Sequence, residues 1–241
     1  MPDSKRVIPL ESNPDIFTAM AHKLGLSPVL EFHDVLSLTE PDLVAFLPQP
    51  VFGVTLLFPI TKEYEDYRTR FDSTRAPYSS ESIDTVRWFK QTIGNGCGLY
   101  ALLHLITNLQ SDLIIDNSLL NSFLIQQLNR SLSTEDIAKL VENLEQQIQL
   151  DENYGSGGQT EAPPPEISVE LHFITFVKGK DNHLYELDGR RTGPVDLGES
   201  VGGSNIIEDP KLNEKIQFYI SNTNEANKHN FAMIALGPSL D

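Results

Sequence analysis

The spacing of apolar residues predicts helices in several parts of the chain. Apolar side chains recur every three to four residues over residues 15–24, 62–73 and 97–108, which is the spacing of one helix face. Two further helices are predicted to begin at Ser118 and Ser133 and to end near 126–130 and 149. Side-chain oxygens can cap the helices that follow residue 13, Ser118 and Ser133, and Gly25 ends the first helix. A short helix ending at Phe46 is also expected.

Other apolar segments are continuous and predict strands. Residues 50–59 are apolar on both faces and bounded by prolines, which favours a central strand covered on both sides. Residues 169–177 and 184–190 form two further strands, joined into a hairpin by a polar turn. Residues 7–10 fit a short edge strand, whereas 32–36 are ambiguous. The core is therefore expected to contain a covered sheet.

Composition narrows the choice of partner and compartment. The formal net charge of −16 opposes binding to nucleic acid or an anionic membrane, and favours solubility or a basic partner. The single cysteine excludes an internal disulfide, and no apolar run resembles a signal peptide or a membrane span. We therefore expect an intracellular protein located in the cytoplasm, with the nucleus as a second compartment.

The single cysteine, Cys97, lies where a glycine-rich loop meets an apolar helix. Unpaired N–H groups and the positive end of the helix dipole favour a thiolate at such a position. Gly96 and Gly98 leave room for a substrate backbone, and the side-chain amide of Gln91 could form an oxyanion hole with the N–H of Cys97. The alternative is a buried, structural cysteine.

The predicted hairpin brings a histidine close to a carboxylate. A turn centred between Lys180 and Asp181 places His172 opposite Asp188 to within one residue. A carboxylate bonded to one imidazole nitrogen leaves the other free to take a proton from a thiol. The alternative is a hydrogen-bonded core histidine. The remaining histidines lack such a partner or lie in helix or turn positions, and no spacing of His, Cys and Asp predicts a metal site.

A glycine-, proline- and acid-rich segment, residues 151–166, separates the helices from the hairpin. Its composition does not support packing into a core. The segment is either a domain linker or a mobile functional loop.

Three blocks of sequence resemble the active-site blocks of the ubiquitin C-terminal hydrolases, the papain-like family C12 of deubiquitinating cysteine peptidases. The blocks are QTIGNGCG at 91–98, LHFI at 171–174 and LYELDGR at 184–190. The likeness extends to LESNP at 10–14, LLFP at 56–59 and the expected final strand at 230–236, and so covers essentially the whole chain. It implies a single catalytic domain over residues 1–241 of the short type.

The resemblance assigns a role to each site residue. Gln91 matches the oxyanion-hole glutamine, Cys97 the nucleophile, His172 the general base and Asp188 the residue that orients it. Asp34 matches an acid that contacts ubiquitin in relatives, whereas Lys228 stands where some relatives carry an acid.

The resemblance also implies an α+β fold. In that fold an antiparallel sheet is covered by helices on both faces, the chain is knotted, and residues 151–166 form an active-site crossover loop.

The expected function is thiol-dependent hydrolysis of small amides, esters and peptides from the C-terminal glycine of ubiquitin or a Rub-type modifier. Neither cofactor nor metal is expected, and the protein is expected to be a monomer. Two alternatives remain, a non-catalytic ubiquitin-binding module and a structural protein with an inert thiol. Both treat the set of Gln91, Cys97, His172 and Asp188 as coincidence.

Overall fold

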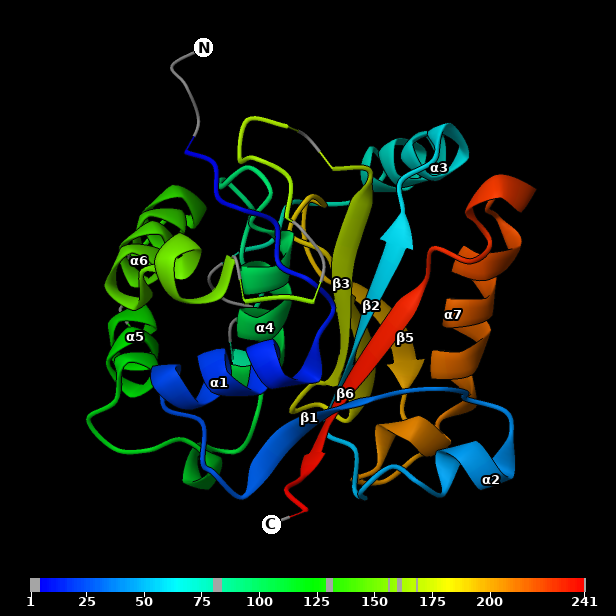
Figure 1. Cartoon of the computed structure of the whole chain (residues 1–241), viewed down its shortest axis with the longest axis horizontal. Coiled ribbons are helices and arrows are strands. Elements are labelled where there is room, and N and C mark those ends of the chain that lie inside the picture. Colours follow the sequence, from blue (N-terminus) through cyan, green and yellow to red (C-terminus); the bar gives the residue numbers. More distant parts are fainter. Residues whose placement is uncertain are drawn as a thin grey trace.

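A six-stranded antiparallel sheet forms the centre of the protein in a computed structural model (Figure 1). The structure describes residues 5–79, 84–128, 132–155, 157–159, 162–167 and 169–240. The strand order is β1-β6-β2-β3-β4-β5. The strands span Leu30–Asp34 (β1), Gly53–Pro59 (β2), Leu171–Lys178 (β3), His183–Leu187 (β4), Val195–Glu199 (β5) and Ala232–Pro238 (β6).

Strand β2 lies in the interior of the sheet, between β6 and β3, as its apolar sequence predicted. Its side chains alternate between two hydrophobic clusters, one on each face of the sheet. Val54, Leu56 and Phe58 belong to one cluster, and Leu57 packs against the other. Continuous apolar sequence is required where neither face meets water.

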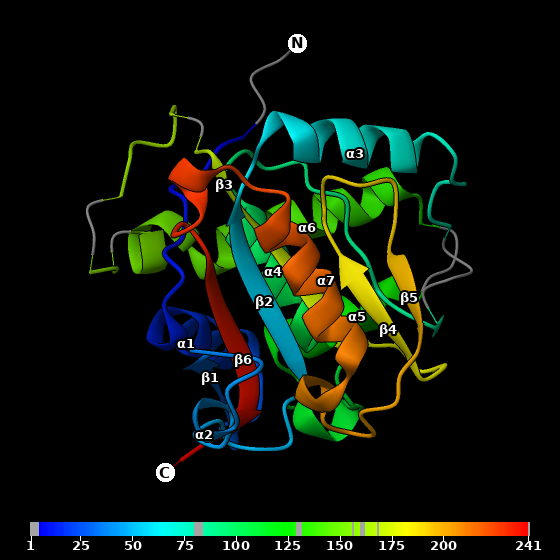
Figure 2. The same cartoon turned by 90° about the vertical axis from the view of Figure 1, so that its right-hand side faces the viewer.

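Helices cover both faces of this sheet (Figures 1 and 2). One face carries α1 (Pro14–Leu24), α4 (Cys97–Ile106), α5 (Leu119–Gln127) and α6 (Thr134–Ile148). The other carries α3 (Lys62–Asp72) and α7 (Pro210–Ser221), while the short α2 spans Pro41–Val44. The predicted α+β architecture with a doubly covered antiparallel sheet is therefore confirmed. The predicted knot stays a prediction.

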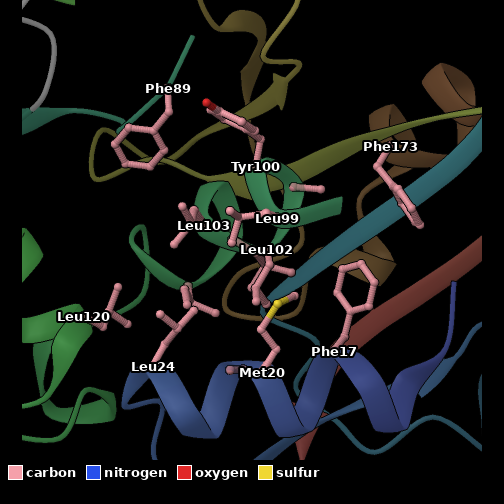
Figure 3. Close-up of a cluster of buried hydrophobic side chains, with 14 of the residues drawn as sticks. Phe17, Met20, Leu24, Phe89, Leu99, Tyr100, Leu102, Leu103, Leu120 and Phe173 are labelled. Carbon is pink, nitrogen blue, oxygen red and sulfur yellow. The ribbon is translucent and has the colours of Figure 1, made fainter. Parts of the chain in front are cut away.

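Helix α4 is buried along its whole length, because helices and sheet surround it. Its leucines pack against Phe17, Met20 and Leu24 of α1 in the cluster drawn in Figure 3. Toward the sheet, the Thr175 hydroxyl of β3 donates a hydrogen bond to the Ala101 carbonyl at 2.8 Å. An apolar sequence on all sides of a helix is typical of such an enclosed position. This packing fixes where the first residue of α4, Cys97, lies.

The predicted helix caps are confirmed. The Asn13 side chain accepts hydrogen bonds at the start of α1, and Gly25 ends that helix with a left-handed φ of 119°. Ser118 caps α5, and Ser133 forms a capping box with Asp136 at α6. Helix α5 ends at Gln127, within the predicted range 126–130, of which residues 129 and 130 lie outside the described part of the chain.

Several predictions of elements need correction. Residues 7–10 are not an edge strand; only a bridge between Arg6 and Gly94 forms there. Of the ambiguous segment 32–36, residues 32–34 form the end of β1, which begins at Leu30. No element was predicted for β5 or α7. Among the described residues, no helix has both the length and the apolar character needed to cross a bilayer.

Candidate active site

The thiol of Cys97 lies at the N-terminus of α4, as the glycine-rich loop indicated. Asn95 turns the chain into the helix with a left-handed φ of 58°, and Gly96 occupies the N-cap. A Cβ added at Gly98 would lie 3.0 Å from Leu10, so the N-terminal segment can pack closely here. The backbone N–H groups of Gly98 and Phe173 face the sulfur and lower the pKa of the thiol. The site therefore offers several donors to a thiolate.

His172 of β3 contacts both the thiol and a carboxylate. Its Nε2 lies 2.7 Å from Asp188 Oδ1, and the other ring nitrogen remains for the hydrogen bond with Cys97. The predicted facing positions of His172 and Asp188 need correction, however. Thr175 faces Leu187 in the ladder, and this register, continued, places Asp188 opposite Ile174. The carboxylate reaches His172 diagonally, because residues two apart share one face of a strand.

Both carboxylate oxygens of Asp188 are occupied. Oδ1 accepts from His172 and from the Arg190 backbone N–H at 2.8 Å, and Oδ2 accepts from the Tyr64 hydroxyl at 2.7 Å. The indole N–H of Trp88 donates to the backbone carbonyl of Asp188 at 2.9 Å. The carboxylate is fully buried, so these bonds replace its lost hydration.

These contacts set the pKa values of the site. Burial by itself raises the pKa of the Cys97 thiol, but the hydrogen bond and charge of His172 outweigh it and bring the pKa below its ordinary value. Burial by itself lowers the pKa of His172, yet the charge and hydrogen bond of Asp188 raise it to about 9. Burial opposes ionisation of Asp188, but the charge of His172 holds its pKa well below the ordinary range. The geometry therefore favours a thiolate beside an imidazolium.

Gln91 lies beside this group, but the structure does not show it in an oxyanion hole. Its side-chain Nε2 donates to the Ile93 carbonyl at 3.1 Å, and its backbone N–H donates to the Gly189 carbonyl at 2.8 Å. The amide carries a second N–H. The oxyanion role of Gln91 therefore stays a prediction.

A cavity of about 200 Å³ opens onto Cys97. Leu57, Leu171 and Phe173 form the part of its wall that comes from the sheet. The rest of the lining comes from the N-terminal residues 9–12 and from Gly155, Gly158, Ala162, Pro163 and Val169. The segment 151–166 is therefore part of the candidate site, and its interpretation as a plain linker is wrong.

The N-terminal segment and Asn95 anchor this loop. The Ile8 backbone N–H donates to Asp151 Oδ1 at 2.7 Å, and the Gln159 backbone N–H donates to Glu11 Oε2 at 2.7 Å. At the other end, the Asn95 amide donates to the carbonyls of Pro165 and Ile167 at 3.0 and 2.9 Å. Ser156, Thr160 and Glu161 lie outside the described residues.

Asp34 does not lie in the cavity of Cys97 but in a neighbouring groove of about 740 Å³. Glu11, Asp15 and Glu31 also line this groove. Glu11 and Ser12 line both hollows, so the acidic groove continues into the cavity. Lys228, where some relatives carry an acid, pairs with Glu225.

Sequence reasoning missed several residues of the site. The helix predicted over residues 62–73 was given no role in the site, but its Tyr64 is only 5 % exposed and bonds to Asp188. The bond from Trp88 to Asp188 and the bond from Asn95 to the loop were likewise not predicted. A glycine-rich turn with asparagine is a recognisable signal for a left-handed position. Nothing local in the sequence connects Tyr64 to Asp188.

A thiol, a histidine and a buried carboxylate in this order define a thiol-dependent hydrolase. Within the described ranges, no group of three or more His, Cys, Asp or Glu side chains could hold a metal ion. The sequence comparisons agree with this class. Residues 7–221 match the family profile "Ubiquitin carboxyl-terminal hydrolase, family 1".

The chain belongs to this family of cysteine peptidases. It is 40% identical over 241 residues to ubiquitin carboxyl-terminal hydrolase YUH1 of Saccharomyces cerevisiae, covering 98% of each chain. It is 37% identical over 205 residues to the rat isozyme L1, covering 85% of this chain and 88% of the relative. The relatives are named as hydrolases, which supports catalysis over the non-catalytic binding module.

A solved structure supports the same fold. The catalytic domain of Trichinella spiralis UCH37, bound to ubiquitin vinyl methyl ester, superposes with a TM-score of 0.69 at 23% identity. The match covers 97% of this chain and 95% of that chain. At this level of identity the likeness concerns the fold.

Proposed function

We propose that this cysteine peptidase hydrolyses the bond after the C-terminal glycine of ubiquitin or a Rub-type modifier. The observation that carries this proposal is the chain of contacts from the Cys97 thiol through His172 to Asp188, in a cavity that continues into an acidic groove. The names of the relatives and the ubiquitin derivative bound to the solved homologue supply the modifier.

The first step forms a thioester. The Cys97 thiolate attacks the carbonyl carbon of the terminal glycine, and the developing oxyanion is stabilised by the N–H of Cys97 and the amide of Gln91. The imidazolium of His172 then gives its proton to the leaving amine, and the C–N bond breaks. Asp188 holds the ring by Nε2, so the proton faces the reacting sulfur and the leaving group.

The second step restores the enzyme. His172, now neutral, takes a proton from water, and the resulting hydroxide attacks the thioester. The C–S bond breaks, the sulfur departs as the thiolate beside the imidazolium, and the modifier leaves as a carboxylic acid that gives its remaining proton to the solvent. The low pKa of the Cys97 thiol makes it a good leaving group in this step.

The modifier's tail is recognised by charge. Glu11, Asp15, Glu31 and Asp34 line the groove that leads to the cavity. A basic, glycine-ended tail complements these carboxylates, and its glycines can pass the narrow cavity beside Leu10. The loop over the cavity limits the leaving group to amines, peptides and unfolded tails.

The direct test is turnover of a fluorogenic C-terminal amide of ubiquitin, with the same amide of a Rub-type modifier in parallel. Wild type is expected to release the fluorophore, and Cys97→Ala to retain less than a few per cent of kcat. Binding of the modifier to this variant should stay within about 1 kcal/mol of wild type, because the sulfur acts mainly in the transition state. Absence of turnover with both modifiers, or full activity of Cys97→Ala, would overturn the proposal.

A further inference from the structure

The orientation of the Asp188 carboxylate depends on a residue from a distant helix. Tyr64, in the first turn of α3, donates its hydroxyl proton to Oδ2 across 124 positions of sequence, at 2.7 Å. Oδ1 holds His172 at 2.7 Å and the Arg190 N–H at 2.8 Å. Rotation of the carboxylate would break bonds at both oxygens. The hydrogen bond from Tyr64 therefore helps to maintain the hydrogen bond between Asp188 and His172.

Packing fixes the tyrosine in place. The Thr61 side chain caps α3 through the Tyr64 backbone N–H, and the ring meets Phe58 edge-on at 4.9 Å. Phe58 faces His172 in the β2–β3 ladder and meets its ring at 5.9 Å. Tyr64 and His172 thus both pack against Phe58 while they bond to opposite oxygens of Asp188.

The hydroxyl stays a donor over the working pH range. Burial, followed by the charge of Asp188, raises the pKa of Tyr64 well above its ordinary value. A hydroxyl that donates to a carboxylate forms one of the stronger hydrogen bonds in proteins.

We propose that Tyr64 is a positioning residue for hydrolysis, whose hydroxyl keeps Asp188 Oδ1 on Nε2 of His172. This inference rests on the proposed roles of Asp188 and His172. Without the hydroxyl, the carboxylate is free to rotate and to recruit water, so the imidazolium loses part of its stabilisation. Tyr64 is buried and does not line the cavity of Cys97, so its loss is expected to leave substrate binding unaffected.

A second buried tyrosine offers a matched control. Tyr219 of α7 packs against Phe58 at 4.6 Å and Tyr64 at 5.7 Å, in the same aromatic cluster. It is 4% exposed, and its hydroxyl has no hydrogen-bond partner among the described residues. Tyr219→Phe therefore removes the same atom from the same cluster without touching Asp188.

Other charges around Asp188 are the same in both variants. Arg68 on α3, Arg191 after β4 and His104 on α4 act on Asp188 through their charge or respond to it, and Cys97 contacts His172. A difference between the two variants in the pH profile therefore reports the lost Tyr64 hydrogen bond.

The experiment measures kcat, KM and the pH profile of fluorogenic ubiquitin amide turnover for wild type, Tyr64→Phe and Tyr219→Phe, with a melting curve for each. Tyr64→Phe is expected to lower kcat by about tenfold or more, the rate equivalent of one charge-assisted hydrogen bond, with KM within about twofold. The alkaline limb should move to lower pH by about half a unit or more. Tyr219→Phe should leave kcat, KM and the alkaline limb of the pH profile at wild-type values.

A double-mutant cycle shows whether Tyr64 acts through Asp188. In an Asp188→Asn background, adding Tyr64→Phe should change kcat by less than about twofold. Full additivity, equal losses in the two tyrosine variants, or a fall in kcat without movement of the alkaline limb would overturn the inference. An active wild type with an unaffected Tyr64→Phe refutes only this inference, whereas an inactive wild type refutes the proposed function and this inference with it.

Discussion

Two buried histidines show how neighbouring groups decide the chemistry of a residue. His104 is enclosed in α4, where its Nε2 lies 3.0 Å from the Phe89 backbone N–H, and burial lowers its pKa to about 4. His172 is equally buried, but the charge of Asp188 raises its pKa to about 9. The first ring stays neutral and structural. The second is poised to carry a proton.

The raised pKa of His172 and the lowered pKa of Cys97 predict a bell-shaped pH profile of kcat/KM. Activity should rise as pH passes the lowered thiol pKa, because the thiolate forms, and should fall as pH rises through about 9, because the imidazolium then loses its proton. Fluorogenic amide turnover between pH 5 and 10.5, with melting curves to exclude unfolding, measures both limbs. An alkaline limb near the ordinary histidine value of about 6.5 would contradict the assignment.

The oxyanion role of Gln91 predicts a loss in kcat rather than in binding. Gln91→Ala should lower kcat on the order of 10²-fold, because one of two oxyanion donors is removed. Gln91→Glu should lose more, since a carboxylate repels the developing charge. Both variants should keep KM within about threefold in the fluorogenic assay. Full kcat in Gln91→Ala would show that its bonds to Ile93 and Gly189 are its only role.

At the scale of elements, two loops meet over the start of α4. Asn95, which turns the chain toward Cys97, also holds the carbonyl of Pro165 near the end of the segment 151–166 and that of Ile167 just beyond it. Glu11 binds Gln159 in the middle of this segment, and Ile8 binds Asp151 at its beginning. Residues of both anchored segments line the cavity of Cys97.

The length of the crossover segment predicts a size limit on the leaving group. Its sixteen residues span at most about 53–58 Å when extended, so a ring closed by a short base is no wider than about 20 Å. An unfolded tail passes through such a ring, but a compact 100-residue domain with a radius of gyration of about 13 Å does not. Insertion of ten Gly/Ser residues after Gly157 should therefore permit cleavage of a folded, isopeptide-linked substrate.

The comparison needs kcat/KM for a small amide and for the folded substrate. The small-amide rate should change by less than about tenfold, because loop-closure entropy grows slowly with length. The same insertion after Asp116, in the exposed turn before α5, is the control and should leave the folded substrate uncut. Efficient cleavage of folded substrate by wild type would refute the size limit.

At the scale of the whole molecule, the sheet carries a hydrophobic cluster on each face and the reacting groups at one end. Strand β2 ends at Pro59 opposite Leu171, the first residue of β3, so His172 lies at the end of the sheet where α3 and α4 begin. The two clusters hold these elements rigidly on opposite faces. The acidic groove lies outside these clusters, where its carboxylates can attract a basic partner.

The net charge of −16 predicts that binding of a modifier with a basic tail is steered electrostatically. The association rate of ubiquitin with Cys97→Ala, measured by stopped-flow at about 0.02 and 0.5 M salt, should fall at high salt, because counterions screen the field. The dissociation rate should change less. Asp34→Asn should reduce the salt dependence if the acidic groove takes part. An association rate that does not depend on salt would refute steering.

The sequence by itself determined the elements whose signals are local. Asn13, Ser118 and Ser133 mark helix starts because a cap bonds only to N–H groups two or three residues away. The continuous apolar run of β2 indicated an interior strand, and the resemblance assigned roles to Gln91, Cys97, His172 and Asp188. Adjacent residues carry all of this information.

Only the tertiary structure decided which distant groups meet. Three contacts join residues far apart in sequence. Asp188 reaches His172 diagonally across the strand register, Tyr64 bonds to Asp188, and Asn95 anchors the loop. Residues 7–10 have the pattern of a strand but pack as an extended segment against the loop. Periodicity and capping depend on residues that are close together in the chain. The contacts named above form only when the sheet and its two helical layers assemble.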